Sequence, residues 1–229
     1  MVKSKELKLM RKKIEKAEKL PNPLAALEKT PANDLPFALP HDNDTDKAYS
    51  LQATAASNLS PDLLQKLLDI FQDNMGDLYR ASSWGLDLDD KARQLGHRKA
   101  RYLLLWSNSN HANTPEEDDD EEENKTLAAF VHYRFDFDDD ERPEFAVLYV
   151  YEIQVVDGFQ RQGLGGALMA VLEALGRATD MSKVMLTVLN QNVGAAEFYR
   201  QKCGYVVDAS DPSNYNDPTA DYKILSKTL

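Results

Sequence analysis

Cysteine and histidine are scarce in this sequence, and their arrangement suits neither a disulfide nor a metal. The 229 residues include one cysteine, Cys203, so no disulfide can form within the chain, and a reducing compartment is expected. The four histidines show no metal-ligand spacing, so no metal site is predicted. No apolar run is long enough to span a bilayer, no signal peptide is recognisable, and the start Met1-Val2 lacks the glycine that N-myristoylation requires. We therefore expect no membrane association.

Basic residues are also in deficit. The chain has 27 lysines and arginines against 38 acidic residues, which gives a net charge of −11. Residues 116–123 form an unbroken run of eight carboxylates, and the rest of the chain carries only −3 of the total. Direct DNA binding is therefore not expected. The run lies in a polar loop, residues 113–124, which we predict to be disordered because its charges repel one another.

The sequence predicts a short N-terminal region and one main domain. Residues 1–58 are expected to be a basic helix, residues 3–19, followed by a strap, and residues 59–229 the domain into which the acidic loop is inserted. The basic helix has an apolar side, and the pattern supports equally its packing on the domain and a nuclear-targeting or ribosome-proximal role. Ser60 and Pro61 are suited to begin the first helix of the domain.

Helix and strand patterns alternate along the domain. Apolar and β-branched runs predict strands, and glycine or asparagine precedes each helical pattern between them. This order predicts an α/β fold with a mixed central sheet flanked by helices, and it excludes all-helical and all-β classes. The expected strands are residues 101–106, 126–135, 146–155, 183–188, 205–207 and 221–226.

A glycine-rich turn follows the strand 146–155. Asp157-Gly158 is suited to positive backbone dihedrals, and Gln160-Arg161-Gln162-Gly163-Leu164-Gly165-Gly166 leads into a helical pattern at residues 167–178. Glycines before a helix let the backbone approach a ligand, and the unpaired N–H groups of the first turn favour a phosphate. The spacing matches neither the dinucleotide-binding fingerprint nor the P-loop.

Two motifs in this region resemble the coenzyme A site of the GNAT superfamily of N-acetyltransferases. The first is Gln160-x-x-Gly163-x-Gly165, and the second is Asn192-x-x-Ala195-x-x-Phe198-Tyr199 followed by Gly204-Tyr205. The resemblance implies the GNAT fold and acetyl-CoA as cofactor, with Tyr199 placed to protonate the leaving coenzyme A thiolate. Its implied cofactor contacts are Ile153, Gln154, Val155, Arg161, Gln162, Gly163, Leu164, Gly165, Gly166, Thr187 and Asn192.

A narrower resemblance covers about residue 59 to the end of the chain. Tyr79-x-x-x-x-Trp84-Gly85, Phe135-Asp136-x-Asp138, Leu148-Tyr149-x-Tyr151-Glu152, residues 183–188 and Tyr222-x-Ile224-Leu225 are similar to motifs of the NatD family of N-alpha-acetyltransferases. That family acetylates the N-terminal serine of core histones whose tails begin Ser-Gly-Arg-Gly. The sequence departs from it at Asp138, often a glutamate, at Gln160, often basic, and in the acidic insertion.

The NatD resemblance implies roles for specific side chains. Glu152 is the candidate general base, directly or through water, and a structural ion pair is the alternative. On a regular strand Glu152 would point away from Tyr149 and Tyr151, so both roles require a β-bulge here. Asp136 with Asp138 would receive the peptide arginine. The implied substrate-binding residues are Tyr79, Trp84, Asp136, Phe137, Asp138, Tyr149, Tyr151, Thr187 and Tyr222, although the pattern around Tyr79 and Trp84 alone favours core packing.

Two other functions remain open from the sequence. A GNAT enzyme that acetylates lysine side chains or small amines would keep the same cofactor site, and a non-catalytic histone-binding module would use the acidic run to bind basic tails. If the protein is a NatD-like acetyltransferase, we expect it to have histone tails as partners, to be a monomer with no obligate auxiliary subunit, and to be located in cytoplasm and nucleus.

Overall fold

The computed structural model describes residues 4–27, 49–108, 125–139, 141, 143–215, 217 and 219–229. One seven-stranded sheet runs through this part of the chain, in the order β1-β2-β3-β4-β5-β7-β6. All neighbouring strands are antiparallel except β4 and β5, which are parallel, so the predicted mixed sheet is confirmed. The strands are β1 (Tyr49–Ala55), β2 (Arg101–Asn108), β3 (Lys125–Phe137), β4 (Ala146–Val155), β5 (Lys183–Leu189), β6 (Val206–Val207) and β7 (Tyr222–Thr228).

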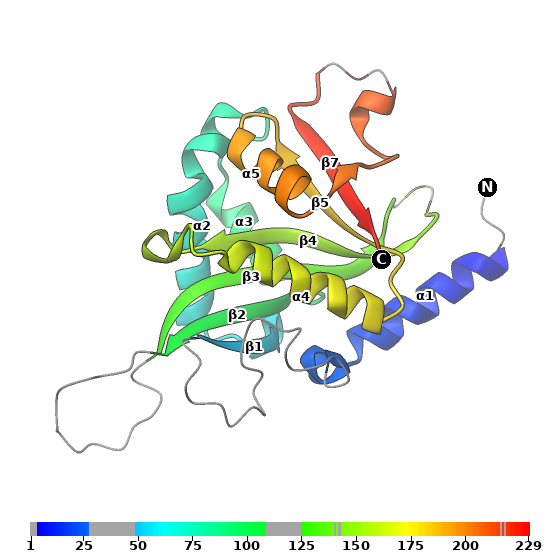
Figure 1. The fold of residues 1–229 in the computed structure, drawn as a ribbon, viewed down its shortest axis with the longest axis horizontal. Coiled ribbons are helices and arrows are strands. Elements are labelled where there is room, and N and C mark those ends of the chain that lie inside the picture. The colour runs from blue at the N-terminus through cyan, green and yellow to red at the C-terminus, as the bar shows by residue number, and fades with distance from the viewer. Residues whose placement is uncertain are drawn as a thin grey trace.

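Helices cover both faces of the sheet. In Figure 1, α4, drawn in yellow, crosses in front of the sheet, while α2 and α3, in cyan, lie behind it. Each face has its own apolar core, one formed with α4 and the N-terminal helix α1, the other with α2 and α3. The helices are α1 (Ser4–Glu18), α2 (Pro61–Ala81), α3 (Leu88–Leu95), α4 (Leu164–Ala178) and α5 (Val193–Glu197), and α5 continues into the π-helical turn η5 (Phe198–Lys202).

The predicted N-terminal helix packs on the domain. In α1, Ile14 and Ala17 are buried in the α4-side core, whereas the lysines of its other side are exposed. This arrangement supports packing of the helix on the domain, one of the two roles left open. The domain boundary at residue 58 stays a prediction, and the acidic loop lies outside the described residues.

The structure differs from the sequence analysis at three places. Residues 49–55, expected to be part of a strap, form β1 and pair along their whole length with β2. Helix α3 was not predicted, and α2 runs on to Ala81, so Tyr79 lies within the helix. Residues 157–159 form a short 3-10 helix instead of a turn with positive φ; the left-handed residues come later, at Arg161 (φ 62°) and Gly163 (φ 84°).

Candidate active site

The two parallel strands separate at one end of the sheet. β4 and β5 pair only from Val147–Lys183 to Val150–Leu186, and no further pair joins them among the described residues. A cavity opens where they separate, between the second half of β4 and the end of β5. Its lining comes from α2, β4, β5 and α5, and includes Tyr79, Trp84, Tyr151, Glu152, Thr187 and Tyr199. The structure thus brings together residues that are up to 120 positions apart in the sequence.

The predicted phosphate cradle lies at the start of α4. Gly163 is the N-cap residue in a left-handed conformation, offers no side-chain cap, and has no atom within 4 Å of where a Cβ would stand. The first N–H groups of a 15-residue helix are therefore left to a ligand, and with the helix dipole they suit a pyrophosphate. The described residues of the cradle fit the diphosphate of coenzyme A.

Strand β1 supports the cradle, a contact that the sequence did not predict. The hydroxyl of Tyr49 donates to Oε1 of Gln162 at 2.9 Å, and the Tyr49 ring meets that of Phe159 edge-on. Gln160 donates from Nε2 to the carbonyl oxygen of Val155 at 3.1 Å. Gln160 and Gln162 thus hold the loop in place through its own backbone and β1.

The required β-bulge is present in β4. The β3–β4 ladder passes from His132–Glu152 directly to Tyr133–Val150, so that β4 has one residue, Tyr151, more than β3. Because of this extra residue, Tyr149 and Glu152 both lie on the α2–α3 side of the sheet, opposite Arg134 and His132 respectively. The ring of Tyr151 lies on that side too, 4.9 Å from the ring of His132 and 5.1 Å from that of Tyr149.

Glu152 is held in a buried ion pair with a lysine that was not predicted. Nζ of Lys91 lies 2.7 Å from Oε1 of Glu152, and the side chains are 7% and 5% exposed. The other oxygen, Oε2, accepts from Nε2 of Gln154 at 2.9 Å. Lys91 also donates to Oε1 of Gln94 at 2.7 Å and to the Tyr79 hydroxyl at 3.3 Å, so its three N–H donors are all used.

The charge of Lys91 is favoured by these partners. Burial alone would lower the pKa of Lys91, but Glu152 and Tyr79 outweigh it, and the pKa is raised above its usual value. Lys91 therefore stays protonated, and the pair as a whole is neutral. One sequence signal could have revealed the buried position of Lys91. It shares helical spacing with Leu88 and Leu95 and so takes a core position on α3.

Behind the pair, a neutral histidine positions Tyr151. His132 is completely buried between the rings of Tyr102 and Tyr151, at 5.3 and 4.9 Å. Burial, and next the nearby Arg134, lower the pKa of His132 to about 2, so the imidazole is uncharged at neutral pH. Arg134 donates from Nε to Nε2 of His132 and lies 4.1 Å from the Tyr151 ring. These contacts leave Tyr151 little freedom to turn.

Aromatic side chains form one wall of the site. Trp84 is 45% exposed and lies between the rings of Tyr79 and Tyr222, at 5.7 and 5.4 Å. The core position that the sequence pattern favoured is therefore wrong for Trp84. Ser83 attaches this wall to the start of β7, because its backbone N–H and hydroxyl donate to the carboxylate of Asp221, which directly precedes that strand.

Tyr149 and Thr187 join the two separating strands. Their hydroxyl oxygens are 2.5 Å apart, and burial chiefly raises the pKa of Tyr149 to about 12. Tyr149 therefore stays protonated across the working pH range of an enzyme. Thr187 also lines the cavity. Its contacts with cofactor and substrate stay a prediction.

Tyr199 faces the cavity from the π-helical turn after α5. Among the described residues, none makes a hydrogen bond with its hydroxyl, although the side chain is only 8% exposed. Burial, followed by the charge of Glu152, raises the pKa of Tyr199 well above its usual range. The phenol is thus protonated and able to donate one hydrogen bond into the cavity. Asn192 lies nearby as the N-cap of α5, accepting from the Ala195 N–H.

The two predicted arginine-binding carboxylates have separate lysine partners. Asp136 lies 3.5 Å from Nζ of Lys99, and Asp138 lies 3.5 Å from Nζ of Lys183. Phe137, predicted to bind substrate, instead packs with the α4-side core, because alternate residues of β3 face opposite sides of the sheet. The structure therefore does not bring Phe137 into the site.

Comparison with known proteins identifies the fold. Residues 86–205 match the sequence profile of the acetyltransferase (GNAT) family. Among solved structures, an acetyltransferase from Streptococcus agalactiae is similar at a TM-score of 0.52 and 13% identity, covering 78% of this chain and 98% of that one. The PaiA N-acetyltransferase from Thermoplasma acidophilum, solved with coenzyme A, is similar at a TM-score of 0.50 and 14% identity, covering 79% and 99%.

Proposed function

This chain belongs to the acetyltransferase (GNAT) family, whose acetyl donor is acetyl-CoA, and we propose that its acceptor is the N-terminal α-amine of core histone tails beginning Ser-Gly-Arg-Gly. The observation that carries the proposal is the β-bulge at Tyr151. It brings a buried carboxylate, Glu152, to the same face as a wall of aromatic side chains, at a cavity that Tyr199 also lines. These are the residues through which the sequence resembles the NatD family.

The cofactor would enter where the strands separate. The N–H groups at the start of α4 would bind the pyrophosphate, and the backbone of residues 153–155, on the separating edge of β4, would bind the pantetheine arm as a further strand does. When bound there, acetyl-CoA supplies a thioester whose carbonyl carbon an amine can attack.

The charge state of the site favours an α-amine over a lysine. An α-amine has a pKa of roughly 7.7–8.0, so about a tenth of it is neutral at pH 7, compared with less than about one in a thousand for lysine at 10.4. Because Lys91 already balances Glu152, an incoming ammonium gains little from this carboxylate. An acceptor that arrives neutral is therefore preferred, and Glu152 would take up its proton, directly or through water, as the new amide forms.

Tyr199 would stabilise the leaving thiolate. A thiol has a pKa near 8.5, whereas the pKa of Tyr199 is raised above that of an ordinary phenol. Complete proton transfer from Tyr199 would be uphill, so a hydrogen bond from its hydroxyl to the sulfur is the better-supported form of the predicted acid role. The absence of any described partner for that hydroxyl supports this role.

The aromatic wall supports a small first residue. Tyr79, Trp84 and Tyr222 stand side by side, and Tyr149 and Tyr151 face the same side of the sheet. Rings packed against one another in this way would leave room for serine and glycine and reject bulky side chains. The peptide arginine would then reach the carboxylates of Asp136 and Asp138 beyond the wall.

An acetyl-transfer assay tests the proposal against its alternatives. Radioactive acetyl-CoA would be offered with a Ser-Gly-Arg-Gly peptide, with the same peptide blocked at its N terminus, and with a blocked peptide containing an internal lysine. We expect label only in the free Ser-Gly-Arg-Gly peptide. Label in the blocked lysine peptide would instead favour a side-chain acetyltransferase, and no label in any peptide, with tail binding retained, a non-catalytic module.

The same proposal includes its cellular setting. We expect the protein to act on histone tails as a monomer without an auxiliary subunit, in cytoplasm and nucleus. Light scattering of the purified chain, with activity measured at the same concentration, checks the first point. No described helix is long and apolar enough to cross a membrane.

A further inference from the structure

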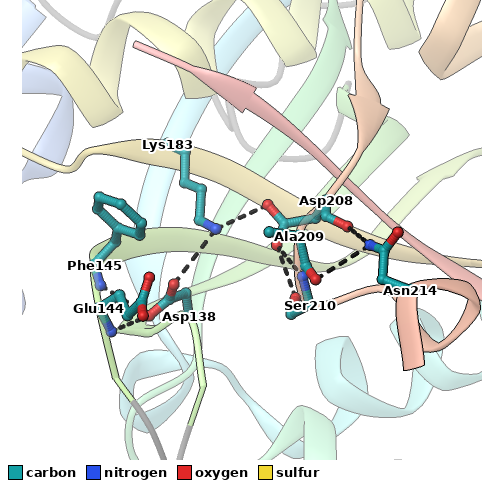
Figure 2. Close-up of polar contacts among 8 residues, drawn as sticks. All are labelled: Asp138, Glu144, Phe145, Lys183, Asp208, Ala209, Ser210 and Asn214. Carbon is teal, nitrogen blue, oxygen red and sulfur yellow. Dashed lines mark hydrogen bonds and ion pairs between the residues drawn. The ribbon is translucent and has the colours of Figure 1, made fainter. Parts of the chain in front are cut away.

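One buried lysine serves two carboxylates at the start of β5. Nζ of Lys183 lies 2.8 Å from Oδ2 of Asp208 and 3.5 Å from Oδ2 of Asp138, and the three side chains are between 4% and 10% exposed. Figure 2 shows the ammonium between the two acids, with Asp208 contributed by the segment after β6 and Asp138 by the residue directly after β3. This group of three carries a net charge of −1.

The lysine is not shared equally. At 2.8 Å the contact with Asp208 is a charge-assisted hydrogen bond, whereas 3.5 Å to Asp138 lies beyond hydrogen-bond distance. Asp208 is further fixed by Ser210, whose backbone N–H and hydroxyl donate to Oδ1 at 2.9 and 2.8 Å. Burial would favour its protonated form, but the bonds from Lys183, Ser226 and Ser210 lower the pKa of Asp208 to about 2.

Within the described part of the chain, Asp138 therefore keeps one oxygen without a full partner. Its Oδ1 accepts from the backbone N–H groups of Glu144 and Phe145, both at 2.9 Å, so the carboxylate is held in its present orientation (Figure 2). Among the described residues, only the distant ammonium of Lys183 lies near its Oδ2. A largely buried carboxylate with incomplete compensation favours a second cation, and a guanidinium has five donors for that purpose.

We propose that Asp208 is a specificity-positioning residue, which holds Lys183 away from Asp138 and so keeps Asp138 available to the arginine at the third position of the acceptor peptide. This inference rests on the proposed function and names the part of the fold that tunes its substrate preference. Without the charge of Asp208, Lys183 would turn to Asp138 and occupy the position of the arginine.

A purely structural role makes a different prediction. The three residues join the turn between β3 and β4, the start of β5 and the segment after β6, so any change in them is expected to cost stability. A loss of stability would lower the activity on all peptides by a common factor. Only competition between Lys183 and the peptide arginine changes the ratio between an arginine peptide and its alanine counterpart.

The test compares kcat/KM for Ser-Gly-Arg-Gly and Ser-Gly-Ala-Gly peptides in the full chain and three variants. Asp208→Asn keeps the side chain's size but removes its charge, and the arginine/alanine ratio should fall about tenfold. Lys183→Met combined with Asp208→Asn removes the competitor as well, and should restore the ratio to at least its original value. Asp211→Asn is the matched control, since Asp211 is 1% exposed in the same segment and binds the backbone of Ile224.

The outcomes distinguish a failure of this inference from a failure of the proposed acetyltransferase function. An unchanged ratio in Asp208→Asn, an equal fall in Asp211→Asn, or no recovery in the double variant would overturn the role of Asp208, while leaving the acetyltransferase proposal standing. If the unaltered protein does not acetylate Ser-Gly-Arg-Gly, or shows no preference for the arginine, the proposed receptor itself is wrong and the inference falls with it. Melting temperatures of all variants confirm that folded proteins are compared.

Discussion

Replacing Glu152 with glutamine separates a catalytic base from a structural ion pair. Glutamine has the same shape but cannot take up the amine proton. If Glu152 is the base, kcat should fall by about a hundredfold or more, equivalent to about 2.7 kcal/mol in the barrier, with a smaller change in KM.

The same substitution should also lower stability, for reasons visible in the contacts. The glutamine oxygen would stay on Lys91, which has only donors, and its NH2 group would then face the NH2 group of Gln154. Gln154 can turn its amide only by giving up the hydrogen bond from Asn74 to its oxygen. Removing one partner of a buried pair costs about 3–5 kcal/mol, so we expect a deficit near the lower value.

A double variant decides between the two roles. In Glu152→Gln with Lys91→Met, the uncompensated ammonium is gone, so part of the stability should return. If Glu152 is the base, kcat stays low in the double variant. The assay is continuous thiol release at saturating Ser-Gly-Arg-Gly peptide, alongside urea unfolding of each protein. Recovery of kcat together with stability, or an unchanged kcat in Glu152→Gln across pH 6–9, would show that Glu152 is structural.

Three further outcomes are expected. Gly163→Asn, which tolerates the left-handed backbone, should keep the fold but weaken acetyl-CoA binding at least tenfold, because its side chain enters the space left for the pyrophosphate; unchanged affinity by calorimetry would place the cradle elsewhere. Tyr199→Phe should lower kcat about tenfold, equally from pH 6 to 9, since the pKa of Tyr199 lies above that range; a loss seen only at high pH would contradict this. The pKa of Asp208 is depressed from 3.8 to about 2, so its ionised form stabilises the fold by about 2 kcal/mol. This stabilisation is complete above the unfolded pKa near 4 and is lost as the pH falls through 2. The difference in unfolding free energy between the wild type and Asp208→Asn should therefore be about half as large at pH 3 as at pH 7.

The cofactor half of the site could be predicted because its signals are local. A glycine at the N-cap and an asparagine capping the next helix lie within a few residues of the backbone groups they serve. The acetyl-CoA dependence drawn from these motifs is confirmed at the level of the family. The bulge could be predicted only as a requirement of the proposed roles. On a regular strand Glu152 would point away from Tyr149 and Tyr151, so all three could face the substrate only if a bulge were present.

The missed elements have weak local patterns. β1 buries only Leu51 fully, because it is an edge strand paired on one side, so apolar alternation is lost. α3 has eight residues, half of them charged, and its buried lysine resembles a surface residue until Glu152, 61 positions away, is placed beside it. The pairing of Lys183 with both Asp138 and Asp208 depends in the same way on tertiary packing.

The extra residue in β4 also changes how this strand can be aligned with others. Before Tyr151, odd-numbered positions such as Tyr149 face α2 and α3, whereas after it even-numbered positions such as Glu152 and Gln154 do. An alignment to a relative with a regular strand is therefore in phase on only one side of Tyr151 and needs a one-residue gap there. Deleting Tyr151 would give a regular strand with both halves on their present faces. Straightening β4 with that residue retained would turn its second half over, placing Glu152 in the α4-side core and Ile153 on the α2–α3 side. In this strand, the change in side-chain alternation at Tyr151 is itself part of what forms the active site.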